Sequence, residues 1–404
     1  MARQFAVPIA LSIAVIALGG RTAALADSRD MSPPAGVSLE LPAAYIATSP
    51  VSRTLDALSL FSNPQTTWFF VVIAAVVLAI VVVRRGSDKL SLTNRLLRTL
   101  GALVACVAII EAIVILVPRP MASLSVSDPD VVRIDFHSHT KASPDANQWF
   151  TAERNREWHE AGGFDVAFLT DHVKWGGVNA GRPLNPATAG AGTSLLSAVE
   201  GHYHKVSTVM LALTEADTSI LNGWGELQPG NPSIGRPPVT IAALPGNLDS
   251  VAAAISNALP QFTGIELVDA APRGLGQLDT EEARIRQLAA SSRLILVSSS
   301  NNHGWGRTVA AWNLMRIPGW RALAPDSVGR LIEEPFRKRD PGAVTIVKRR
   351  RARTHGLTSP LTLPVATYQV VTSLTMPERL VWLVWIWGVT AVVLIVRRRS
   401  AMPR

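Results

Sequence analysis

Most of the histidines in this 404-residue chain follow short apolar segments. Residues 131–136 lead into His137-Ser138-His139, and residues 164–170 lead into Asp171-His172. Two histidines at positions i and i+2 of a strand project from the same face, so both rings can bind one metal ion. The repeated pattern therefore predicts a metal site. The histidines that follow it are His137, His139, His172, His202, His204 and His303, whereas His159 and His355 are expected to be ordinary core or surface residues.

The segments that must position these side chains alternate between strand-like and helix-like patterns, which is typical of an α/β fold. Ligands gathered at the carboxyl ends of several parallel strands converge on the mouth of a barrel. We therefore expect buried parallel strands that end next to the ligands. The predicted strands are 131–136, 164–170, 194–199, 206–213, 239–243, 264–268 and 294–297, and the predicted helices are 147–161, 249–259 and 279–290.

Several motifs in this region resemble those of a known family. Residues 135–140 (Asp-Phe-His-Ser-His-Thr), then Asp145, then residues 169–172 (Leu-Thr-Asp-His), then Glu200, are similar to the successive motifs of the PHP (polymerase and histidinol phosphatase) superfamily. The similarity covers roughly residues 131–310. It implies a distorted seven-stranded β/α barrel, with up to three divalent metal ions at its mouth, in a family composed mostly of phosphoesterases.

The resemblance also implies roles for single residues. Glu200 would bridge two ions and take part in catalysis. Independently of the resemblance, Arg307 follows the last histidine and could bind a substrate phosphate or be an ordinary loop cation. The mixed histidine and carboxylate ligands suit Zn, Mn or Fe, and we expect one to three ions. The implied ligands are His137 and His139 with Asn301 for the first ion, His204 (or, as the weaker candidate, His202) for the second, and Asp145, His172 and His303 for the third.

Two motifs depart from the family pattern. Leu244-Pro245-Gly246 stands where the family has His-Pro-Gly, and Asn301-Asn302-His303 stands where it has Asp-x-His. Leucine cannot bind a metal, and an asparagine carbonyl is a weaker ligand than a carboxylate. We therefore expect reduced metal occupancy or an altered metal preference. Glu266 or Asp269 could supply a replacement ligand.

The composition is 48% hydrophobic, and three long apolar runs account for much of it. Residues 67–83, 99–117 and 380–396 are each about long enough to cross the roughly 30 Å hydrocarbon core of a bilayer. Glu111 lies inside the second run, where a carboxylate is costly unless it faces a partner helix or holds a proton. We therefore predict transmembrane helices at these three runs, flanking the barrel.

The charges next to these runs predict a topology. Segments 84–98 and 397–404 each carry a net charge of +4 and should face the cytoplasm. Residues 1–26 have the pattern of a signal peptide, with an uncleaved anchor as the alternative. Segments 27–66 and 121–376 would then lie on the extracytoplasmic (periplasmic) side of a bacterial inner membrane.

This assignment leaves the predicted exported domain close to neutral, so a nucleic-acid partner is not expected. The expected partners are the lipid bilayer and a small phosphorylated substrate. A basic stretch, residues 337–353, would contact lipid headgroups or a substrate phosphate. The predicted function is a membrane-anchored, metal-dependent phosphoesterase of PHP type. The alternative is a catalytically weakened metal-binding or ligand-sensing domain of the cell envelope.

Overall fold

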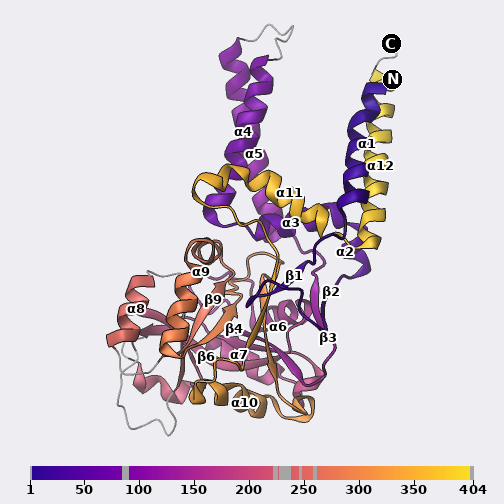
Figure 1. Cartoon of the computed structure of the whole chain (residues 1–404). Coiled ribbons are helices and arrows are strands. Elements are labelled where there is room, and N and C mark those ends of the chain that lie inside the picture. The colour runs from indigo at the N-terminus through magenta and orange to yellow at the C-terminus, as the bar shows by residue number, and fades with distance from the viewer. Residues whose placement is uncertain are drawn as a thin grey trace.

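The computed structural model describes residues 2–83, 91–221, 226, 238–244, 248–257 and 262–400 (Figure 1). Within these residues, ten strands form one mixed sheet in the order β1-β12-β11-β4-β5-β6-β7-β8-β9-β10, and two more, β2 and β3, form a small antiparallel sheet. The strands are β1 Leu25–Asp27, β2 Val37–Glu40, β3 Ser123–Val126, β4 Val131–Ser138, β5 Val166–Leu169, β6 Ser194–Tyr203, β7 Val206–Leu211, β8 Val239–Ala242, β9 Phe262–Asp269, β10 Ile295–Ser299, β11 Ala311–Arg316 and β12 Thr345–Arg349.

The seven predicted strand segments overlap β4 to β10, but the predicted count of seven strands is wrong. Strands β11, β12 and β1 extend the large sheet beyond β4 in the described part of the chain. The sheet also curls back on itself, because Asn301 N donates to His137 O (2.9 Å) and His139 N donates to Asn302 O (2.9 Å). These bonds join the segment after β10 to the end of β4.

The expectation that all of these strands are parallel is also wrong, because β7 is antiparallel to both β6 and β8. The cause is the short connection between β6 and β7. His204 and Lys205 both have positive φ angles, 49° and 63°, and make a tight hairpin turn. Only antiparallel strands can be joined this closely, since a parallel crossover needs a dozen or more residues. The strands β4, β5, β6, β8, β9 and β10 share one direction.

Helices cover this sheet, and the predicted helical segments correspond to α6, α8 and α9. Helix α9 begins at Pro272, seven residues earlier than predicted. The core is apolar and aromatic: Phe136 of β4 stacks on Phe168 of β5 with a 5.7 Å centroid separation and meets Phe336 of α10 edge-on. The helices of the sheet domain are α6 Ala152–Ala161, α7 Gly176–Gly181, α8 Leu248–Asn257, α9 Pro272–Ser292 and α10 Pro325–Lys338.

Three helices in the described residues are long and apolar enough to cross a membrane: α4 Asn63–Val83, α5 Leu92–Leu116 and the Met376–Arg398 part of α12 Met376–Ser400. Helices α4 and α5 lie side by side, as do α1 (Ala2–Leu18) and α12, and both pairs project from the same side of the sheet domain (Figure 1). The start of α1 and the end of α12 lie together, away from the sheet domain. Parts of the predicted cytoplasmic segments, 84–90 and 401–404, lie outside the described residues.

The segment before the predicted cleavage point belongs to the fold. Helix α1 packs on α12, where the rings of Phe5 and Trp387 are 6.5 Å apart. Ala26, the last residue of the predicted signal peptide, is fully buried in β1, which pairs with β12. The signal peptide and the uncleaved anchor both remain predictions.

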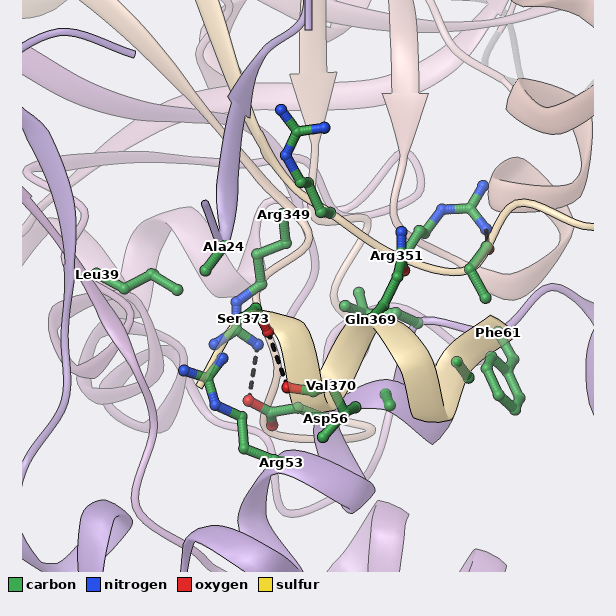
Figure 2. A pocket seen from close by; sticks show the side chains of 15 residues that line it. Ala24, Leu39, Arg53, Asp56, Phe61, Arg349, Arg351, Gln369, Val370 and Ser373 are labelled. Atoms are coloured by element: carbon green, nitrogen blue, oxygen red, sulfur yellow. Dashed lines mark hydrogen bonds and ion pairs between the residues drawn. The ribbon is translucent and has the colours of Figure 1, made fainter. Parts of the chain in front are cut away.

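A small layer joins the sheet domain to the long apolar helices. It is made of α2 Ala43–Ala47, α3 Ser49–Ser59 and α11 Thr362–Thr372. At its centre the buried Asp56 carboxylate of α3 accepts from Tyr45 Oη (2.7 Å) and Thr308 Oγ1 (2.8 Å). It also pairs with Arg349 of β12 (2.7 Å), as Figure 2 shows, and with Arg119, just after α5. One carboxylate therefore connects α3, α5, β12 and the loop after β10.

The basic stretch 337–353 is mostly paired within the fold. Lys348 lies 3.2 Å from Glu282, and Arg351 lies 2.6 Å from Asp279. Its arginines thus hold β12 and the segment after it against α9, a structural role that the sequence analysis did not anticipate.

Asp56→Asn should lower the free energy of unfolding by about 3 kcal/mol, because it leaves two buried guanidinium groups without a counter-charge. Burial raises the pKa of Asp56, but Arg349 and Arg119 outweigh it and lower that pKa from 3.8 to about 2. The contribution of Asp56 is therefore fully present above pH 3.8 and is lost as the pH falls towards 2. Denaturant unfolding of the detergent-solubilised chain at several pH values measures both effects.

The control is Asp249→Asn, which breaks the exposed pair with Arg284 and should change stability by less than about 1 kcal/mol. Equal effects of the two substitutions would contradict the central role of Asp56.

Candidate metal centre

The two histidines at the end of β4 point to one place. His137 and His139 are almost completely buried, and their Nε2 atoms are 3.0 Å apart. This is the geometry that the i, i+2 spacing predicts. Glu200 of β6 reaches the same point, because its Oε2 is 3.2 Å from His137 Nε2 and 3.4 Å from His139 Nε2. His137, His139 and Glu200 form a buried group that could hold a metal ion.

The other ring nitrogen of each histidine is held by an acceptor. His137 Nδ1 donates to Glu266 Oε1 of β9 (2.8 Å). His139 Nδ1 donates to Ser143 Oγ (2.9 Å), because the Ser143 hydroxyl itself donates to Asp171. These bonds direct both Nε2 atoms at the centre. Two facing Nε2 lone pairs repel each other unless a cation lies between or beside them, so the donor set fits a metal ion.

A second group adjoins the first. His172, after β5, has Nδ1 at 3.1 Å from Glu200 Oε2 and Nε2 at 3.3 Å from Asp145 Oδ2. His303, after β10, has its Nε2 at 3.3 Å from the same Asp145 oxygen, and this buried nitrogen makes no hydrogen bond. His303 Nδ1 donates to Asn301 O (2.9 Å). The rings of His139, His172 and His303 also form a group that could hold a metal ion, so His139 and Glu200 lie between two candidate positions.

The charges at this point favour a cation. Burial lowers the pKa of His137, but the carboxylates of Glu200 and Glu266 outweigh burial and raise that pKa well above 6.5. Burial raises the pKa of Glu200, but His137, His139 and His172 outweigh burial and hold that pKa well below its usual range. Burial and the neighbouring His137 lower the pKa of His139. A proton or a metal ion is thus attracted to the same place, and the two compete.

The two departures from the family pattern have clear structural consequences. Leu244 is buried, and its backbone N–H donates to Glu266 Oε2 (2.7 Å). Each Glu266 oxygen thus accepts one hydrogen bond, and through one of them this residue positions His137. Asp269 accepts from Ala271 N (2.7 Å) and Asn301 Nδ2 (3.1 Å). Residues 245–247 lie outside the described part of the chain.

Not every predicted site residue joins the two groups. His204 lies at the exposed tip of the β6–β7 hairpin, and His202 is exposed on β6. Asn301 has a positive φ of 43°, and its buried Oδ1 makes no hydrogen bond. Arg307 lies in a separate cavity with Arg154, and burial together with that arginine lowers the pKa of Arg307. The structure brings together His137, His139, Asp145, His172, Glu200 and His303.

Three residues support the candidate site without a role predicted from the sequence: Thr140, Ser143 and Asp171. Asp171 accepts from the backbone and hydroxyl of Thr140 (2.6 and 2.8 Å) and from Ser143 Oγ (3.0 Å), which fixes the loop after β4. Asp171 stands beside His172 in the Thr-Asp-His motif, so a signal was present. Ser143 gave no comparable signal, because its role depends on the fold of the loop.

Comparisons with known proteins add little to this geometry. The structure is similar to PsfC from Pseudomonas syringae PB-5123, with a TM-score of 0.35, 12% identity, and coverage of 59% of this chain and 98% of that one. It is also similar to a protein from Bifidobacterium adolescentis provisionally described as a metal-dependent phosphoesterase, with a TM-score of 0.28, 16% identity, and coverage of 50% and 95%. Scores of this size do not establish a shared fold. No family model and no curated protein matches the sequence.

Glu266→Gln should weaken metal binding about 10- to 100-fold, because an amide holds the His137 ring less firmly than a carboxylate and supplies no negative charge. Competition between the purified chain and a chelator of known affinity measures the change. Glu333→Gln is the matched control, since Glu333 is equally buried but pairs with Arg337 on α10. If both variants bind metal like the wild type, Glu266 does not position a metal ligand.

Proposed function

We propose that the chain is a membrane-anchored, metal-dependent phosphoesterase of PHP type. The observation that carries the proposal is the pair of His137 and His139 Nε2 atoms, 3.0 Å apart and both directed at Glu200. Support also comes from the adjoining group of Asp145, His172 and His303, which places a second set of ligands beside the first. The motifs that resemble the PHP superfamily are the ones that supply these residues.

The described residues provide ligands for two ions. His137, His139 and Glu200 would hold one, Asp145, His172 and His303 would hold the other, and Glu200 would contact both. Paired divalent ions lower the pKa of a bound water and bind phosphate oxygens, which is the chemistry that ester hydrolysis needs. The chain itself orients the rings through Glu266 and the loop after β4.

We further propose that the sheet domain lies outside the cytoplasm of a bacterial cell. The basic segments 84–98 and 397–404 support this orientation through the positive-inside rule. An uncleaved α1 leaves that orientation unchanged, because its Arg3 is then expected on the same side as the C-terminal arginines.

The purified full-length chain should carry two divalent ions and hydrolyse phosphate esters, and His139→Ala should lower turnover at least about 100-fold because His139 contacts both candidate positions. Metal analysis and a broad phosphoester panel measure these results. His355→Ala, which alters an exposed histidine far along the chain, should retain both metal and activity. One ion or none, with no turnover, would favour the alternative of a metal-binding or ligand-sensing domain.

The orientation can be tested with single cysteines in a Cys106→Ser background, since Cys106 is the only cysteine. A membrane-impermeant maleimide applied to intact cells should label Thr280→Cys, in the sheet domain, and leave Ser87→Cys unlabelled. The reverse pattern would place the sheet domain in the cytoplasm.

A further inference from the structure

The candidate metal centre opens into a cavity of about 370 Å³ that extends to the membrane helices. Asp145 and His303 of the metal centre form part of its wall. Glu111, Val114 and Ile115 of α5 form another part. These three positions have the i, i+3, i+4 spacing that places them on one face of a helix. The cavity therefore joins ligands of the metal centre directly to one face of a helix that can span the membrane.

The loop that carries His303 contacts the end of α5 directly. Gly306 N, in the loop that follows His303, donates to Ile115 O in the last turn of α5 (3.2 Å). Leu58 and Phe61, at the end of α3 and just beyond it, add apolar surface to the cavity. Val114 and Ile115 belong to the apolar span Leu92–Leu116. The apolar wall of the cavity thus lies at the end of the span, where the bilayer surface is expected.

A neighbouring cavity of about 200 Å³ lies against the same helix end. It is lined by Ile115 and Leu116 together with Arg154, Arg307 and Trp149. Glu157 also lines this cavity, which therefore holds two arginines and one carboxylate. Trp149 is 72% exposed. Arginines and exposed tryptophans are typical of protein surfaces that face lipid headgroups.

We propose that the substrate is an amphiphile, a phosphorylated membrane lipid that reaches the metal centre from the bilayer surface. Its phosphate ester would lie at the metal centre, and its apolar part would lie against Val114, Ile115 and Phe61. In the hydrolysis, the oxygen of water forms a new bond to phosphorus and the bond from phosphorus to the lipid oxygen breaks. That oxygen leaves with the electron pair and takes one proton from the water. The inference rests on the proposed phosphoesterase function and specifies its substrate class.

The apolar wall of the cavity favours a lipid over a small soluble ester as the substrate. A soluble phosphate ester gains nothing from buried apolar side chains, whereas the chains of a lipid stay in apolar surroundings as the lipid passes from the bilayer into the cavity. A lipid already in the bilayer needs only to move along the membrane to meet the α5 face of the cavity. Ser59 and Thr66 also line the cavity and can hydrogen-bond a hydroxylated headgroup.

The test compares dioleoyl phosphatidic acid with glycerol 3-phosphate, which carry the same phosphomonoester with and without acyl chains. The full chain in phosphatidylcholine nanodiscs should show kcat/KM at least about 100-fold higher for the lipid, because the shared bilayer raises the effective concentration of the lipid next to the cavity. If both esters are hydrolysed equally well, the lipid inference is overturned and the phosphoesterase function stands. If the metal-loaded chain hydrolyses neither ester nor any of the phosphoester panel, both proposals fall.

Val114→Trp fills the cavity and should lower the ratio of the two kcat/KM values at least tenfold. Ile109→Trp is the matched control on the same helix, because Ile109 is 58% exposed and does not line the cavity, so this variant should keep the wild-type ratio. Native mass spectrometry provides a readout independent of turnover: Val114→Trp should retain less phosphatidic acid than wild type or Ile109→Trp. Equal retention by all three chains would contradict the assignment of the cavity.

Discussion

The arrangement of this protein depends on one buried carboxylate, Asp56. It holds two guanidinium groups, one just after α5 and one on β12, and it also accepts from Thr308 in the loop after β10. A buried charge that lost its partners would cost several kcal/mol, so α5, β12 and that loop are held together as one unit. The same loop carries His303. The position of the candidate metal centre relative to the long apolar helices therefore follows from the pairing of Asp56.

Within the sheet domain, two carboxylates have different contacts at the candidate metal centre. Glu266 holds the outer nitrogen of His137, whereas Glu200 faces the inner nitrogens of His137, His139 and His172. Their negative charge explains why the site attracts a cation despite its burial. The shared direction of β4, β5, β6, β9 and β10 brings these residues from distant parts of the sequence to one edge. The reversed β7 contributes no side chain to either group.

The sequence predicted what depends on local spacing. The i, i+2 histidines and the Thr-Asp-His motif identified residues that do converge, and the apolar runs identified the helices that can cross a membrane. It did not predict the hairpin at His204, because a His-Lys turn lacks the Asn-Gly or Gly signature of such turns. Nor could it predict the Asp56 contacts with Arg119 and Arg349, since apolar periodicity gives the buried face of an element and not its distant partner. The predicted roles of single ligands remain predictions.

Leu244, at the position where the motif that it resembles has histidine, offers no metal ligand, but its backbone supports one of the candidate groups. Glu266 is held at this position by the backbone N–H of Leu244, a group that every residue except proline supplies. The orientation of His137 is therefore independent of the side chain at position 244. His204 is turned away in the hairpin, and the side chains that do converge form two groups that could each hold a metal ion, His137 with His139 and Glu200, and His139 with His172 and His303.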